Sequence, residues 1–219
     1  MLFSLIKNEI IIEVKSSFNL FYISFFALSS LILLFFSMPL TFLNDPNILS
    51  SFFWIIISFS SIKVVENSFA REKEFGIYDL IYSSPVYGHL FFLSKLLVFT
   101  FVLLIIEFLI FLFYSLLNPM ISISDLKILF PLFLISNTSI ISLAIIIYLI
   151  TSSERIKSFL FPLIFFPLLT PILINSSRIF TNTYIDDNIS NLPSIMILLS
   201  YSLISVILGV QFFSTLIKK

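Results

Sequence analysis

The sequence contains no cysteine, only three glycines and one histidine among its 219 residues. Without cysteine the chain forms no disulfide, offers no thiolate to a metal and cannot carry a CxxCH haem-attachment motif. A nucleotide-binding GxxxxGK(S/T) loop needs two glycines five positions apart, and Gly76, Gly88 and Gly209 do not supply them. Any ATP that drives this protein must therefore be hydrolysed by another chain. The same scarcity argues against GxxxG helix contacts, so close packing has to use Ser, Thr and interlocking aromatic side chains.

Charge is scarce as well. Only 11% of the residues are charged and 59% are hydrophobic, and the mean hydropathy is +1.13, whereas soluble domains carry about 25% charged residues. Runs of roughly 20 apolar residues, the length that crosses a bilayer, recur along the chain. The sequence therefore predicts an all-α integral membrane protein. Its zero net charge argues against nucleic-acid binding, which depends on basic surfaces.

The polar residues also argue against an enzyme. An intramembrane active site needs a nucleophile with a base, or a cluster of metal ligands, at membrane depth. The chain offers one histidine, His89, at the expected cytoplasmic end of a span, and one carboxyl group deep within an apolar run, Glu107. We expect no catalytic residue, no metal site and no cofactor bound by this chain, and we interpret His89 as an interfacial residue.

Six apolar runs predict six membrane-spanning helices within a single transmembrane domain of residues 1–219. Their approximate bounds are 18–38, 48–65, 90–117, 128–150, 159–174 and 193–216. The fifth contains Pro162, Pro167 and Pro171, so we expect it to be kinked or locally unwound, which neighbouring helices must compensate. Residues 1–16 mix apolar and charged side chains and predict an interfacial amphipathic helix, with a plain cytoplasmic extension of the first span as the alternative.

The basic residues indicate which ends of the spans face the cytoplasm, because cytoplasmic segments are enriched in Lys and Arg. With the N-terminus inside, only Lys127 and Arg178 of the 12 basic residues fall in outer segments. The inner segments hold Lys7, Lys15, Lys63, Arg71, Lys73, Lys95, Arg155, Lys157, Lys218 and Lys219. We therefore expect both termini to be cytoplasmic.

The largest polar island lies between the second and third predicted spans. A charged run at 66–74 is followed by Gly76, a short amphipathic turn that contains Asp79, and Pro85. Residues 66–89 are predicted to form a cytoplasmic loop that contains a short helix parallel to the membrane. Such a helix can transmit motion from a cytoplasmic motor, because its charges dock the motor while its apolar face stays on the bundle. The alternative is a solvated loop that only links two spans.

Glu107 is the acidic residue expected deepest in the membrane. It lies about 12 residues beyond Lys95, or roughly 18 Å along a helix, which is past the bilayer midplane. A carboxyl group there is costly unless it faces the bundle or a partner. We predict that Glu107 is protonated, or hydrogen-bonded to the fourth span, which is rich in Ser and Thr. A shallower position near the outer interface is the alternative.

The polar island and the proline-rich fifth span together resemble the CcmB family. The family pattern runs from an apolar helix with a Trp, through an acidic residue, a Phe, a charged run, a Gly, an acidic residue and a Pro, to a Lys in the third span. The matching positions are Trp54, Glu66, Phe69, Arg71, Glu72, Lys73, Glu74, Gly76, Asp79, Pro85 and Lys95. A Pro-x-x-x-Pro segment follows at Pro167 and Pro171. The fourth span departs from the pattern, with Ser and Thr where the family has more Gly.

The resemblance implies the membrane subunit of the haem-exporter-type ABC transporter of cytochrome c maturation, with half-permease architecture. It implies a CcmA-type ATPase that docks on the polar island, a second copy of the chain, a CcmC-type haem-handling subunit and the haem chaperone. The expected docking residues are Glu66, Phe69, Arg71, Glu72, Glu74, Gly76, Asp79 and Pro85. The implied location is the bacterial inner membrane, with the mitochondrial inner membrane left open. The alternative function is a half-permease of an unrelated ABC exporter for a lipid, a polysaccharide or a drug.

Overall fold

The computed structural model describes residues 2–15, 17–74, 87–118, 121–151, 157–185 and 191–216. Within these ranges the regular structure is helical and includes no strand, which confirms the all-α class. The elements are α1 (Leu2–Lys15), α2 (Ser17–Ser37), α3 (Leu40–Leu43), α4 (Pro46–Glu74), α6 (Gly88–Leu117), the 3-10 turn η1 (Ile123–Asp125), α7 (Leu126–Thr151), α8 (Lys157–Ile185) and α9 (Leu192–Leu216).

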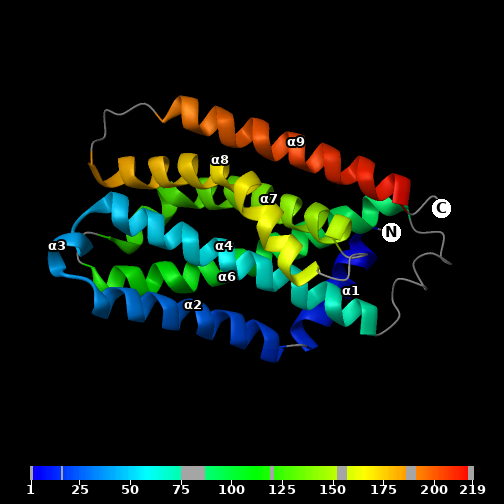
Figure 1. The fold of residues 1–219 in the computed structure, drawn as a ribbon, viewed down its shortest axis with the longest axis horizontal. Coiled ribbons are helices and arrows are strands. Elements are labelled where there is room, and N and C mark those ends of the chain that lie inside the picture. Colours follow the sequence, from blue (N-terminus) through cyan, green and yellow to red (C-terminus); the bar gives the residue numbers. More distant parts are fainter. Residues whose placement is uncertain are drawn as a thin grey trace.

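Six of the described helices are long and apolar enough to cross a membrane, as predicted: α2, α4, α6, α7, α8 and α9. They lie alongside one another in Figure 1, with α3 at one end of the bundle and α1 at the other. The last turn of α4 and the last turn of α9 also lie at the α1 end. The described part of the chain is therefore a multi-pass helical bundle, and the charged residues of α1 and of the last turns of α4 lie at the same end of it.

The centre of the bundle is built from α4, α6 and α7, which are buried over larger shares of their length than α2, α8 and α9. Phe53 of α4 lies at this centre. Its ring stacks on Phe133 of α7 and Phe180 of α8 at centroid distances of 5.4 and 5.3 Å, and meets Tyr114 of α6 edge-on at 5.7 Å. The predicted use of interlocking aromatic rings in place of glycine contacts is thus confirmed.

Hydroxyl side chains make further contacts between helices, which the shortage of glycine also predicted. Ser136 of α7 and Ser176 of α8 are hydrogen-bonded through their Oγ atoms at 2.7 Å. Five residues further along α8, Thr181 is hydrogen-bonded to Ser50 of α4 at 2.8 Å. All four side chains are buried. Small hydroxyls therefore let α8 approach both central helices without leaving a polar group unpaired.

Two helices extend beyond their predicted ends. The prediction ended the second span at residue 65 and the fifth at residue 174, but α4 continues to Glu74 and α8 to Ile185. The added turns of α4 are rich in Glu, Lys, Arg and Ala, which are strong helix formers. The added turns of α8 contain polar residues that are buried against the bundle, Ser176 and Thr181 among them. Tertiary contacts therefore continue both helices past the apolar runs on which the prediction depended.

The three prolines Pro162, Pro167 and Pro171 all lie inside α8. The helix is continuous through them, and Figure 1 shows that its first part runs at an angle to the remainder. The predicted kink is confirmed, whereas the alternative of local unwinding is wrong. A proline removes one backbone hydrogen bond and bends a helix without ending it when neighbouring helices support the turn.

Candidate functional site

The charged run after residue 65 is part of α4 and not of a loop. Phe69 and Glu72, which are three positions apart, lie on one side of the helix and are both buried. Because α4 continues to Glu74 and α6 begins at Gly88, the predicted loop of 66–89 is too long at both ends. The physical reason is that Phe69 and Glu72 each find partners inside the bundle, so this part of the run is packed and not solvated.

Lys95 of α6 is the centre of this site. Its side chain is fully buried, and its Nζ donates to Oε1 of Glu72 on α4 and lies 3.1 Å from Oε1 of Glu9 on α1. One ammonium group therefore joins three helices. A buried charge is tolerated only when it is paired and hydrogen-bonded, and two carboxylates meet that condition for Lys95.

Aromatic rings surround the same ammonium group. The Lys95 Nζ lies 4.9 Å from the ring centroid of Phe69, 4.8 Å from that of Phe91 and 5.3 Å from that of Phe99. These distances are within the range of a cation–π contact. The rings keep water away from the ion pairs and so strengthen them. They also give Phe69 a role as part of the wall around Lys95.

A second ion pair joins α1 to α4. Arg71 donates from Nη2 to Oε1 of Glu13 across 2.6 Å and from Nε to the backbone oxygen of Asn67 across 3.2 Å. The two side chains are largely buried, with relative exposures of 14% for Arg71 and 7% for Glu13. Because Glu9 binds Lys95 one turn earlier, α1 is attached through two successive turns of its length.

These five residues, Glu9, Glu13, Arg71, Glu72 and Lys95, are called the charge cluster below. It contains three carboxyl groups and two basic groups, so it carries an excess of one acidic group. Two of its buried polar atoms, Nη1 of Arg71 and Oε2 of Glu72, have no hydrogen-bond partner among the residues that the structure describes. The charge cluster can therefore accept one further donor and give one further hydrogen bond beside α4.

The charge cluster also fixes the orientation of α1. Glu9 and Glu13 face the bundle and are buried, while the apolar residues Phe3, Ile10, Ile11 and Val14 are exposed on the outside. An outward apolar face is what a helix at a lipid interface presents to the acyl chains. The outer side also carries the exposed Lys7, Asn8 and Lys15, so it is mixed in polarity, and the interfacial placement of α1 stays a prediction.

Sequence reasoning missed Glu9 and Glu13 as site residues. Their spacing of four positions places both on one face of a helix, and acidic residues are rare in this chain, so a signal was present. Their partners, however, lie 86 residues away in the case of Lys95 and 58 residues away in the case of Arg71. Spacing within one helix does not indicate which distant base it faces.

Glu107 lies on α6, away from the charge cluster, and is fully buried. Its Oε2 accepts a hydrogen bond of 2.6 Å from Nδ2 of Asn137 on α7, so the predicted contact with the fourth span is present. The other carboxyl oxygen of Glu107 and Oδ1 of Asn137 have no partner among the described residues. A proton on that second oxygen would complete a cyclic acid–amide pair, because the acid would then donate to the amide oxygen.

The remaining predicted site residues are dispersed. Trp54 is buried in the aromatic centre beside Phe53 and Phe133. Glu66 forms a 3.0 Å ion pair with Lys63 on the exposed side of α4 and does not join the charge cluster. Pro167 and Pro171 lie within α8. Outside the described residues lie Gly76, Asp79, Pro85 and the side chain of Glu74.

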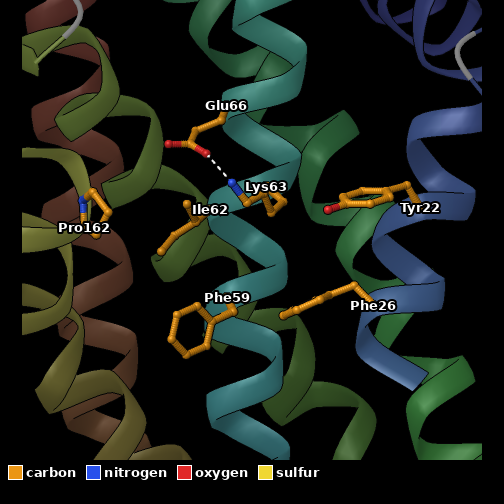
Figure 2. A pocket seen from close by; sticks show the side chains of 7 residues that line it. All are labelled: Tyr22, Phe26, Phe59, Ile62, Lys63, Glu66 and Pro162. Carbon is orange, nitrogen blue, oxygen red and sulfur yellow. Dashed lines mark hydrogen bonds and ion pairs between the residues drawn. The ribbon is translucent and has the colours of Figure 1, made fainter. Parts of the chain in front are cut away.

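A groove lies on the outer side of α4, between α2 and α8, and Figure 2 shows it from close by. It encloses about 300 Å³ and is lined by Tyr22, Phe26, Phe59, Ile62, Lys63, Glu66 and Pro162. A second cavity of about 410 Å³ lies between α4 and α8 nearer the α3 end, beside Trp54 and Arg178. The exposed pair of Lys63 and Glu66 therefore borders a hollow and not a smooth surface.

The fold and the charge cluster define a class: a multi-pass helical membrane protein in which buried ion pairs join an amphipathic helix to the ends of two spans. Residues 1–216 match the family model described as CcmB protein, and the chain belongs to the CcmB family. The chain is thus a membrane subunit of the haem-exporter type of ABC transporter that serves cytochrome c maturation, as the resemblance implied. Neither the curated proteins nor the solved structures contain a match to it.

Proposed function

We propose that this chain is the transmembrane permease subunit of an ABC complex required for cytochrome c biogenesis, and that a separate CcmA-type ATPase drives it. The complex either exports haem or releases the haem-loaded chaperone. The chain itself is non-catalytic and binds no cofactor. The observation that carries the proposal is the family match over residues 1–216 together with the charge cluster at the end of α4.

The charge cluster supports a mechanical role for the end of α4. A force applied at Glu74 would act on a helix whose last turns are joined to α6 through Lys95 and to α1 through Arg71. Breaking one buried ion pair costs about 3–5 kcal/mol, so the three helices are expected to move as one body. Motion of an ATPase would then tilt the second and third spans together.

We further propose that the ATPase docks beside this end of α4, on the polar island that includes Gly76, Asp79 and Pro85. The charge cluster supports this placement, because it ties the last turns of α4, from which the polar island continues along the chain, to α1 and α6. A half-permease needs a second half, so two copies of the chain are expected to face each other above two ATPase chains. A CcmC-type subunit and the haem chaperone complete the proposed complex.

The proposed location is the bacterial inner membrane, with both termini in the cytoplasm, and the mitochondrial inner membrane is the alternative. Ten of the 12 basic residues fall on the cytoplasmic side in this orientation. The charge cluster and the ends of α1 and α4 then face the compartment that contains ATP. This agreement between charge bias and docking surface supports the orientation.

The decisive experiment is a haem stain of c-type cytochromes in a host that lacks the gene, with and without a plasmid copy. Plasmids carrying Lys95→Met and the matched control Lys127→Met, at an exposed lysine of α7, are tested in parallel, and chain accumulation is followed by immunoblot. We expect covalent haem to return with the wild type and with the control but not with Lys95→Met. Cytochromes that are unaffected by loss of the gene would contradict the proposed pathway.

A second measurement tests the partner. The tagged chain is purified in mild detergent, and co-purifying ATPase activity is compared for the wild type and Asp79→Lys. We expect an ATPase to co-purify with the wild type and to be lost with the charge reversal. An ATPase that is retained equally by Asp79→Lys would contradict docking on the polar island while leaving the cytochrome result intact.

A further inference from the structure

The groove on the outer side of α4 has a polar end and an apolar end. Figure 2 shows Lys63 and Glu66 beside each other on α4, with the Tyr22 hydroxyl of α2 turned toward them. Phe26 and Phe59 lie at the other end of the groove, where Phe26 points from α2 toward α4 and the Phe59 ring lies on the α8 side of α4. An elongated amphiphile with a charged head and an apolar tail would match this division.

The lengths and compositions of the helices place the polar end of the groove toward the membrane surface at the α1 end of the bundle. Tyr22 falls within the first turn of the apolar stretch Leu20–Ser37, and Pro162 within the first turn of Phe159–Tyr184. Lys63 and Glu66 lie nine and six residues before the end of the stretch Pro46–Glu72, which runs in the opposite direction. The positions of these residues along three helices therefore all place this end of the groove toward the α1 end of the bundle. Tyr is typical of that depth, where the phosphates of lipid headgroups lie.

The exposure of Lys63 differs sharply from that of Lys95. The Lys63 side chain is 48% exposed and that of Glu66 is 24% exposed, while Lys95 is fully enclosed. A charge that faces lipid from within a span must reach water, a headgroup or a partner. The pair presents one positive and one negative group about 3.0 Å apart, which is complementary to a headgroup that carries a phosphate and an amine.

We propose that the groove binds one phospholipid with a zwitterionic phosphate–amine headgroup from the adjacent leaflet. The phosphate accepts hydrogen bonds from the Lys63 ammonium and the Tyr22 hydroxyl, and the headgroup amine donates to the Glu66 carboxylate. One acyl chain lies along Phe26 and Phe59. The volume of about 300 Å³ is at the lower end of the range for ligand sites, so it holds the head and the upper part of one chain while the second chain stays in the bilayer.

The test is native mass spectrometry of the full chain, purified in mild detergent and mixed with phosphatidylethanolamine or phosphatidylglycerol. The variants are Lys63→Gln, Glu66→Gln and the control Arg178→Gln, which removes an exposed base at the opposite end of α8. We expect the wild type and the control to retain one phosphatidylethanolamine. Lys63→Gln should retain it about tenfold less, the effect of losing a charge-assisted hydrogen bond.

The two lipids separate the roles of the two charges. Phosphatidylglycerol has no amine, so the wild type should retain less of it than of phosphatidylethanolamine, and Glu66→Gln should abolish that preference. Equal retention of lipid by Lys63→Gln and Arg178→Gln would overturn the proposal. The proposal would also be overturned if the wild type formed a lipid-free dimer and Lys63→Gln dissociated it. The groove would then be a contact between two copies of the chain. Lipid retention requires neither the ATPase nor a cytochrome, so its failure would leave the proposed function unaffected.

Discussion

Arg71 near the end of α4 donates to Glu13 on α1 across 2.6 Å, although 58 residues separate them in the sequence. With the Glu9–Lys95 pair one turn away, this contact makes α1 part of the bundle. Glu9 and Glu13 are thereby satisfied by protein, while Phe3, Ile10, Ile11 and Val14 are left exposed on the outer side. Because α1 is attached in this way, it is expected to move together with the end of α4.

The attachment of α1 predicts a specific cross-link. The natural chain contains no cysteine, so cysteines introduced at Glu13 and Arg71 are the only thiols present. We expect Glu13→Cys with Arg71→Cys to be joined by a short bis-maleimide, because the two side chains meet. The pair Phe3→Cys with Arg71→Cys serves as the control, since Phe3 is 80% exposed and lies on the outer side of α1. Equal yields from the two pairs, read as gel mobility shifts, would show that α1 is not held in this orientation.

Removal of the central base should destabilise the chain more than removal of an exposed one. Lys95→Met leaves Glu9 and Glu72 buried without their base, which costs about 3–5 kcal/mol. Lys63→Met removes an exposed partner of Glu66 and should change the free energy of unfolding by about 1 kcal/mol or less. Thermal unfolding in detergent measures both variants.

A triple variant distinguishes charge from packing in that experiment. Lys95→Met combined with Glu9→Gln and Glu72→Gln removes the uncompensated charges, so part of the lost stability should return. No recovery would mean that Lys95 acts through its contacts with the surrounding Phe rings and not through its ion pairs.

Long apolar runs made the six spans predictable, because the bilayer requires a fixed length of apolar helix. The hydrogen bond of Glu107 to the fourth span was predictable for a related reason, since few polar groups occur at that depth. The end of α4 was not predictable, because a charged run is normally solvated. Here Glu72 is buried because it forms an ion pair with Lys95. Lys95 is also paired with Glu9, which is 86 residues away in the sequence. Pairings over such distances depend on how the helices assemble, and no local pattern in the sequence encodes them.

The Glu107–Asn137 pair predicts that an amide can replace the acid. Glu107→Gln keeps a carbonyl oxygen that accepts from Nδ2 of Asn137. Its side-chain amide also adds an N–H donor for Oδ1 of Asn137, which has no partner among the described residues. This variant should therefore match the wild type in thermal unfolding. Glu107→Leu leaves the Asn137 amide buried without a partner and should cost about 1–3 kcal/mol.

A double variant provides the control for this pair. Glu107→Leu with Asn137→Leu removes both polar groups and should recover part of the loss. If Glu107→Gln destabilises the chain as much as Glu107→Leu does, the carboxyl group is ionised and the acid–amide interpretation is wrong.

The orientation of the bundle can be tested by thiol labelling in intact cells, again because the chain has no cysteine of its own. Asn8 on α1 and Asn44 after α3 are both exposed, and Figure 1 places α1 and α3 at opposite ends of the bundle. A membrane-impermeant maleimide should label Asn44→Cys in intact cells and Asn8→Cys only after the membrane is permeabilised. The expected difference follows from the excess of Lys and Arg at the α1 end, which is retained on the cytoplasmic side during insertion. Labelling of Asn8→Cys from outside would reverse the orientation and place the charge cluster away from ATP, so docking of an ATPase at the end of α4 would then be ruled out.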